Sequence, residues 1–169
     1  IGRHLARAAR LFGVRVSGLN SSGRPCVDVE KVFTAEGMAE FLEQLDYVVV
    51  TLPDTPLTKH LVNADVLAMM KPSAILINTA RGPVVDPEAL YTALKQGQIA
   101  RAALDVTEPE PIPADHPLLT LDNLIIAPHI ASASLATRGK MAEMAVDNLL
   151  AGLAGERLPN CVNPEIYRG

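Results

Sequence analysis

Short apolar runs alternate with amphipathic stretches along the whole chain. The runs at 47–52 and 74–78 are rich in Val, Ile and Leu, which is typical of strands buried on both faces of a sheet. Together with other apolar runs, they predict six strands, at 14–19, 29–33, 47–52, 74–78, 99–104 and 124–127. Apolar residues at intervals of three and four predict five helices, at 2–12, 38–45, 63–70, 87–96 and 134–150.

Residues suited to helix ends flank several of these segments. Asn63 and Asp86 have short polar side chains, which accept hydrogen bonds from the backbone N–H groups of a first helical turn. Pro87 fits the first position of a helix, and Gly13 fits the position just after one. The alternation of strands with helices predicts a parallel sheet in an α/β, doubly wound, Rossmann-like fold.

The loops that follow parallel strands meet at one edge of the sheet, where ligands bind in such folds. Polar residues that could take part in chemistry are concentrated in these loops, which favours a site at this edge. They are Asn20, Thr79, Arg81, Asp105, Glu110 and His129.

A single arginine follows the predicted strand at 74–78. Arg81 is followed by Gly82 and Pro83, and proline restricts the geometry of such a turn. Its guanidinium could hold a substrate carboxylate through two hydrogen bonds and polarise a neighbouring carbonyl. A surface salt bridge is the alternative interpretation.

A histidine and two glutamates follow the next two predicted strands. Glu108 and Glu110 lie in a proline-rich segment, and exposed carboxylates are the alternative there. His129 lies between apolar neighbours, and a half-buried structural histidine is the alternative for it. A base, an orienting carboxylate and a cationic anchor at one edge suit hydride transfer to or from a 2-hydroxyacid. The remaining histidines are expected to be structural or exposed, namely His4, His60 and His116.

Two features indicate a dinucleotide. Gly2 opens a helix, as does the last glycine of a G-x-G-x-x-G fingerprint whose first two glycines would precede this chain. A helix that merely begins with glycine is the alternative, and on these residues alone it is favoured. Residues 19–24, at the end of the predicted strand at 14–19, include no carboxylate to bind a ribose 2'-hydroxyl. Asn20, Ser21 and Arg24 could instead accept a 2'-phosphate, which slightly favours NADP over NAD, and a plain polar turn is the alternative.

Composition narrows the class of partner. The chain has 49% hydrophobic residues and a net charge of -4, so the clustered basic residues of a nucleic-acid or anionic-membrane protein are not expected. Two cysteines and the lack of an apolar run of about 20 residues favour the cytoplasm. The chain begins at Ile1 without a strand, so we expect residues 1–169 to be an N-terminally truncated dinucleotide-binding domain whose first strand and substrate domain are missing from this chain.

Three separated motifs resemble the D-isomer-specific 2-hydroxyacid dehydrogenases. They are Leu76-Ile77-Asn78-Thr79-Ala80-Arg81-Gly82, Ala103-Leu104-Asp105-Val106 leading to Glu110-Pro111, and Pro128-His129-Ile130-Ala131-Ser132. The resemblance implies that Arg81 binds the substrate, that His129 is the general acid and base, and that Glu110 hydrogen-bonds His129. It also implies coenzyme contacts at Ile1, Gly2, Leu52, Pro53, Thr58, Thr79, Ala80, Arg81, Asp105, His129 and Ser132.

The segment 105–119 looks most similar to the glyoxylate and hydroxypyruvate reductases of this family. The resemblance therefore implies NAD(P), a small 2-keto acid or D-2-hydroxyacid as substrate, no metal, and a homodimer. One alternative is a non-enzymatic, nucleotide-sensing dimer of the same fold that binds partner proteins. Another is formate oxidation, which Glu110 disfavours because the formate-oxidising relatives carry Gln at that position.

Overall fold

The computed structural model describes residues 1–167, which fall into two compact units. The first unit spans Ile1–His129, and the second begins at Ile130. All six strands lie in the first unit, as do the three side chains of the predicted catalytic set.

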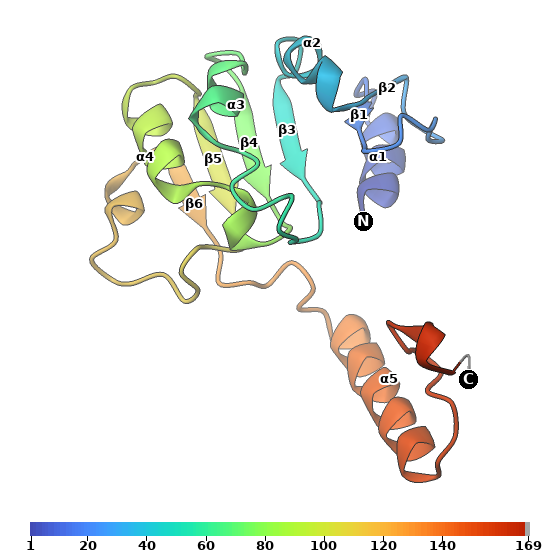
Figure 1. The fold of residues 1–169 in the computed structure, drawn as a ribbon. Helices are drawn as coiled ribbons and strands as arrows, with labels where there is room; N and C mark the ends of the chain where they lie inside the picture. Colours follow the sequence, from blue (N-terminus) through green and yellow to red (C-terminus); the bar gives the residue numbers. More distant parts are fainter. Residues whose placement is uncertain (168–169) are drawn as a thin grey trace. The chain divides into compact units, whose positions relative to one another are not determined.

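A four-stranded parallel sheet forms the centre of the first unit (Figure 1). It contains β3 (Tyr47–Val50), β4 (Ile75–Asn78), β5 (Arg101–Leu104) and β6 (Leu124–Ile126), in this spatial order. Their bounds lie within two residues of the predicted runs. All four strands run in the same direction, so the loops that follow them meet at one edge of the sheet.

A second parallel sheet pairs β1 (Ser17–Leu19) with β2 (Lys31–Phe33). Both strands begin later than predicted, because the chain turns between Cys26 and Val29 and the ladder starts only after that turn. Within residues 1–167, β1 and β3 each pair on one side only. The central strand expected between them stays a prediction.

Helices connect the strands and confirm the α/β class. They are α1 (Gly2–Leu11), α2 (Met38–Leu42), α3 (Ala64–Ala68), α4 (Pro87–Lys95) and, in the second unit, α5 (Leu135–Leu153). The predicted helix at 38–45 ends early, because the N–H of Leu45 bonds to Leu42 three residues back instead of four. Short 3-10 turns that the pattern did not predict are η1 (Ala35–Gly37), η2 (Gly82–Val84), η3 (Pro117–Thr120) and η4 (Pro164–Tyr167).

The predicted caps begin α3 and α4. The Asn63 side chain accepts a hydrogen bond from the backbone N–H of Val66 at 3.0 Å. Asp86 accepts from the N–H groups of Glu88 at 2.9 Å and Ala89 at 3.1 Å. These bonds satisfy donors that have no partner within the helix.

Loss of the Asp86 cap should measurably destabilise the first unit. We expect Asp86→Ala to lower the free energy of unfolding by about 1 kcal/mol, because two backbone donors lose their acceptor. Urea unfolding of the full-length protein measures this change, and Asp86→Asn, which keeps an acceptor, should lie close to the wild type. Equal stability of wild type and Asp86→Ala would contradict the capping role.

The core lies between the four-stranded sheet and the two helices α3 and α4, which cover one face of it (Figure 1). Leu67 of α3, Leu76 of β4 and Leu90 of α4 are almost completely buried there. This packing fixes the carboxyl ends of β4 and β5, from which the candidate site begins. In the described part of α5, by contrast, no residue is buried, and Met141 and Leu149 of its predicted apolar face are exposed.

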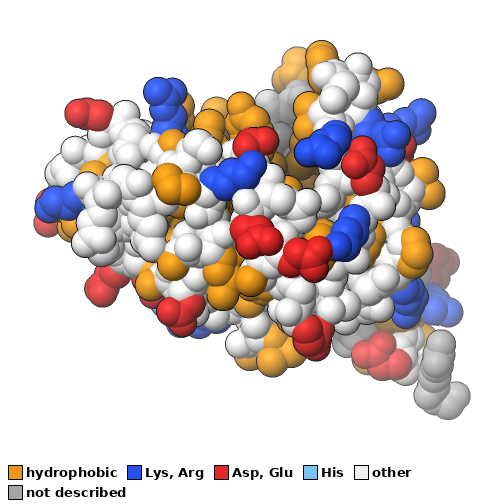
Figure 2. All heavy atoms as spheres, turned by 90° about the horizontal axis from the view of Figure 1, so that it is seen from above, with side chains coloured by type: hydrophobic (Ala, Val, Ile, Leu, Met, Phe, Trp, Pro, Cys, Tyr) orange, Lys and Arg blue, Asp and Glu red, His pale blue; other side chains and the backbone are white. Residues whose placement is uncertain are grey.

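Charged side chains of both signs are interspersed among hydrophobic ones on the face seen in Figure 2. Neither sign dominates that face. Among residues 1–167, no helix has the length and apolar character needed to cross a membrane.

Candidate active site

The turn that carries Arg81 is built on a buried asparagine. Asn78 ends β4 and is 1% exposed. Its amide donates to the carbonyl of Arg81 at 2.9 Å and accepts from the N–H of Ala80 at 3.0 Å. Buried polar groups are costly unless hydrogen-bonded, so these two bonds specify the path of the chain after β4. The Arg81 side chain itself is exposed, and its Nη1 donates to the carbonyl of Ala80 at 2.6 Å.

The turn after Arg81 packs directly against the segment that follows β5. Gly82 is buried, and a Cβ atom placed on it would lie only 1.9 Å from the carbonyl oxygen of Thr107. Only glycine permits so close an approach of two backbones. The loop of Arg81 and the loop of Glu110 are therefore neighbours.

Glu110 and His129 are in direct contact. Their Oε1 and Nδ1 atoms are 2.6 Å apart, and the side chains are 41% and 44% exposed. The backbone of His129 has a φ of 54°, an uncommon conformation for any residue but glycine. Strained backbone of this kind clusters at functional sites. The contact expected between these two residues is present, and their catalytic roles stay predictions.

A second histidine and glutamate also pair at this edge. His60 Nε2 lies 2.7 Å from Glu108 Oε2, and Lys59 Nζ lies 4.0 Å from Oε1 of the same carboxylate. His60 was expected to be structural or exposed, and its pairing with Glu108 was not predicted. The reason is tertiary, since the two residues are brought together by loops after β3 and β5. His116 has the expected structural role, because its Nδ1 accepts from the N–H of Leu118 at 3.2 Å.

The start of α1 offers uncapped backbone N–H groups, and the pyrophosphate contact expected there stays a prediction. The first N–H groups of a helix have no partner within it, and within the described chain Ile1 adds no side-chain cap. The first turn of α1 contains no acidic residue. Gly2 also lies close to the loop after β3, because a Cβ on Gly2 would be 3.2 Å from Thr51 Oγ1. This end of α1 therefore offers donors to an anion near the carboxyl end of β3.

The loop after β1 is held in place by its own asparagine. The Asn20 amide donates to the carbonyl of Arg24 at 3.1 Å and accepts from the N–H of Ser22 at 3.0 Å. Asn20 thus shapes the loop, whereas Ser21 and Arg24 are exposed. A coenzyme contact by any of these residues stays a prediction.

Most of the other predicted coenzyme residues lie in loops of the first unit that follow strands. Thr58 Oγ1 donates to the Pro53 carbonyl at 2.7 Å and closes the loop that follows Leu52. Thr79 Oγ1 donates to the Val50 carbonyl at 3.4 Å and so links the ends of β3 and β4. The remaining residues, Ala80 and Asp105, are buried after β4 and β5, and the exposed Ser132 belongs to the second unit.

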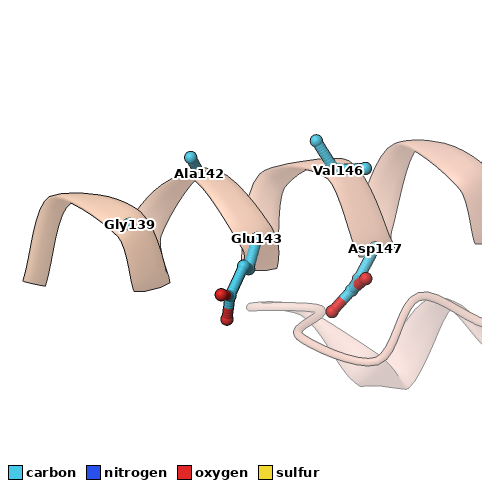
Figure 3. A pocket seen from close by; sticks show the side chains of 5 residues that line it. All are labelled: Gly139, Ala142, Glu143, Val146 and Asp147. Atoms are coloured by element: carbon cyan, nitrogen blue, oxygen red, sulfur yellow. The ribbon is translucent and has the colours of Figure 1, made fainter. Parts of the chain in front are cut away.

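A shallow hollow in the second unit lies along α5. It is lined by Gly139, Ala142, Glu143, Val146 and Asp147. Figure 3 shows both carboxylates on one side of the helix and the two apolar side chains on the other. Across residues 1–167, no group of three or more His, Cys, Asp or Glu side chains could hold a metal ion.

Comparison with known proteins decides the family. The NAD-binding domain of the D-isomer-specific 2-hydroxyacid dehydrogenases matches residues 1–131. The chain belongs to this family. The motifs around Arg81, Glu110 and His129 are therefore those of a D-2-hydroxyacid dehydrogenase, as the resemblance implied.

Several relatives of this D-2-hydroxyacid dehydrogenase chain are reductases. It is 48% identical to a glyoxylate reductase of Korarchaeum cryptofilum, over 99% of this chain and 51% of that protein. Its structure is similar to an NADPH-dependent glyoxylate/hydroxypyruvate reductase from Sinorhizobium meliloti in complex with NADP and malonate, with 37% identity and a TM-score of 0.83, over 94% of this chain and 49% of that one. A D-isomer-specific 2-hydroxyacid dehydrogenase from Xanthobacter autotrophicus is 40% identical with a TM-score of 0.85, over 94% and 52% of the two chains. The chain spans about half the length of the curated relatives it matches.

The sequence did not predict the contacts made by two structural residues of this dehydrogenase site. Asn78 was recognisable only as a polar residue at the end of an apolar strand. His60 gave no local signal, because its partner Glu108 lies 48 residues further along the chain.

Proposed function

We propose that the protein is an NAD(P)-dependent reductase of small 2-keto acids, such as glyoxylate and hydroxypyruvate, and oxidises D-2-hydroxyacids in the reverse direction. The observation that carries the proposal is the contact of His129 with Glu110, next to the turn of Arg81. The names of the relatives, glyoxylate reductase and glyoxylate/hydroxypyruvate reductase, support the same substrates. They also favour an enzyme over a nucleotide-sensing, partner-binding protein.

Each of the three side chains has chemistry that suits one part of the reaction. Arg81 binds the substrate carboxylate through its planar fork and polarises the adjacent carbonyl. His129 donates a proton to the carbonyl oxygen as it becomes a hydroxyl, and accepts that proton in the oxidation. Glu110 contacts Nδ1 and orients the ring, so that Nε2 is the atom turned to the substrate. The nicotinamide supplies the hydride when it is bound.

The rest of the protein is expected to complete the site. We infer a substrate domain, and a central strand between β1 and β3, from the half-length match to the curated relatives and the one-sided pairing of these strands. The side chains that distinguish one keto acid from another would come largely from that domain. We propose that the protein assembles as a homodimer and lies in the cytoplasm.

Steady-state reduction by the full-length protein tests the proposal. Glyoxylate and hydroxypyruvate should be reduced with NADPH or NADH, and formate should not be oxidised with the oxidised coenzymes. A folded protein that binds coenzyme and reduces neither keto acid would contradict the proposed function. It would then favour the partner-binding alternative.

Replacement of the anchoring arginine should weaken substrate binding. We expect Arg81→Lys to raise the KM for glyoxylate by about 10- to 100-fold, because a two-pronged contact with the carboxylate is lost. Initial rates at varied glyoxylate measure the change. Arg101→Lys is the matched control, since Arg101 begins β5 at the opposite end of the strand. A KM that is the same in Arg81→Lys and wild type would speak against an anchoring role.

The loop after β1 should set the coenzyme preference. Ser21 and Arg24 are exposed there, and residues 20–24, which directly follow β1, include no carboxylate, so we propose that NADP is preferred. The reductase from Sinorhizobium meliloti in complex with NADP supports this preference.

The exposed Arg24 allows a direct test of the coenzyme preference. We expect Arg24→Ala to raise the KM for NADPH about tenfold while the KM for NADH changes little, because one charge-assisted contact to the 2'-phosphate is removed. Initial rates with each coenzyme give both values. Equal changes for the two coenzymes would contradict the assignment.

A further inference from the structure

Beside the candidate catalytic pair lies a second pair that the proposed chemistry does not use. Glu108 contacts His60 at 2.7 Å and faces Lys59 at 4.0 Å, so one carboxylate is held by two basic side chains. The Glu108 side chain is 29% exposed, which makes it better shielded than Glu110 at 41%. An ion pair that is partly shielded from water loses less of its strength to screening.

This pair closes a cluster of three loops. The backbone N–H of His60 donates to the carbonyl of Pro83 at 2.7 Å, and Val62 donates to Val84 at 3.0 Å. The turn around Gly82 in turn packs on the carbonyl of Thr107. Backbone contacts therefore join the loop after β3 to the turn of Arg81, and the turn of Arg81 to the segment after β5. The side chain of Glu108 joins that segment back to the loop after β3.

The same segment then carries Glu110 to His129. Thr107 is buried and its Oγ1 donates to the Pro109 carbonyl at 2.8 Å, whereas Pro109 and Glu110 are exposed. Glu108 is thus the last side chain anchored to another loop before Glu110. The contact of Glu110 with His129 is exposed, and exposed ion pairs contribute little by themselves. Its geometry therefore depends on how firmly the backbone before Glu110 is held.

We propose that Glu108 is a positioning residue which, held by His60 and Lys59, fixes Glu110 against His129. The effect on turnover rests on the proposed function, whereas the effect on the His129 contact does not. Without the carboxylate of Glu108, the segment 108–110 loses its link to the loop after β3, and the orientation of the His129 ring becomes variable. The Arg81 side chain, which is proposed to bind the substrate, hydrogen-bonds to the Ala80 carbonyl and not to Glu108. Loss of the Glu108 carboxylate should therefore lower kcat and leave the KM for the substrate unchanged.

Nuclear magnetic resonance of the imidazole N–H protons in the full-length protein tests the contact directly. His60→Gln and His129→Gln assign the two signals, and Glu110→Gln should shift or weaken the hydrogen-bonded signal of His129, because a neutral amide oxygen is a weaker acceptor than a carboxylate. For the same reason we expect Glu108→Gln to shift or weaken the signal of His60, and also to weaken or broaden that of His129. The matched control is Glu40→Gln, because Glu40 pairs with the exposed Lys31 away from this edge. If Glu108→Gln changes the His60 signal and leaves that of His129 intact, the positioning role is overturned.

Kinetics provide the second measurement. We expect Glu108→Gln to lower kcat for glyoxylate about tenfold with an unchanged KM, since small misplacements of a catalytic group are costly. In a Glu110→Gln background the same substitution should have no further effect, because Glu108 acts through Glu110. A tenfold loss in both backgrounds would contradict the proposal. If the wild type reduces no keto acid, the proposed function fails, and the imidazole signals still decide the role of Glu108.

Discussion

Replacement of His129 by glutamine is expected to lower kcat for glyoxylate reduction by about 10²- to 10⁴-fold. The imidazole is the group placed to transfer the proton, and it contacts Glu110 through Nδ1 at 2.6 Å. Glutamine keeps a polar side chain of similar reach but cannot give up and regain a proton near neutral pH. Steady-state rates of the full-length protein with saturating NADPH measure the loss.

A second histidine provides the control for this loss. His116 caps η3 through Nδ1, so His116→Asn keeps a capping acceptor and should retain the wild-type kcat. The dissociation constant for NADPH, measured by fluorescence, should change far less than kcat in His129→Gln. A His129→Gln variant with near wild-type turnover would remove the basis for the acid and base assignment.

Substitution of Gly82 by alanine is expected to disrupt the first unit. The added Cβ would lie 1.9 Å from the Thr107 carbonyl oxygen and 2.8 Å from the backbone nitrogen of Glu108. These atoms belong to a buried or half-buried backbone, so they cannot move aside as the end of a flexible side chain could. We expect the free energy of unfolding to fall by about 3 kcal/mol or more. Activity should fall with it, because the loops of Arg81 and Glu110 are forced apart.

The matched control for Gly82 is a glycine with open space around it. Gly139 lies in α5, and apart from the adjoining backbone of that helix no atom of residues 1–167 lies within 4 Å of an added Cβ. Gly139→Ala should therefore be neutral or stabilise by up to about 1 kcal/mol, since alanine favours a helix. Urea unfolding compares the two variants. Similar stabilities of Gly82→Ala and wild type would mean that the two loops are not in contact.

The sequence predicted best those strands and helix ends that depend on residues close together in the chain. The run at 74–78 is apolar because β4 is paired on both sides and covered by helices, and Asp86 begins α4 through bonds to residues two and three positions ahead. By contrast, β1 and β2 were predicted too long. Their ladder begins only at Ser17 and Lys31, after the chain has turned at 26–29, and the extent of a ladder depends on both strands at once.

In the candidate site, likewise, the sequence predicted some contacts and not others. The order of motifs placed Arg81, Glu110 and His129 after consecutive strands, and parallel strands bring such residues to one edge. The partnership of His60 with Glu108 depends on loops 48 residues apart, and no spacing rule reports it. The sequence does not predict the close approach of Gly82 to Thr107 either. A glycine indicates that a side chain would not fit at its position, but it does not indicate which backbone segment lies against it.

The most direct test of the catalytic assignment is a crystal structure of the full-length protein with NADP and oxamate, an unreactive analogue of a 2-keto acid. The account predicts two hydrogen bonds from the Arg81 guanidinium to the oxamate carboxylate. It also predicts His129 Nε2 at about 2.6–3.2 Å from the oxygen that corresponds to the keto group. Oxamate bound away from Arg81, or an imidazole turned from that oxygen while Glu110 still holds Nδ1, would contradict the assignment.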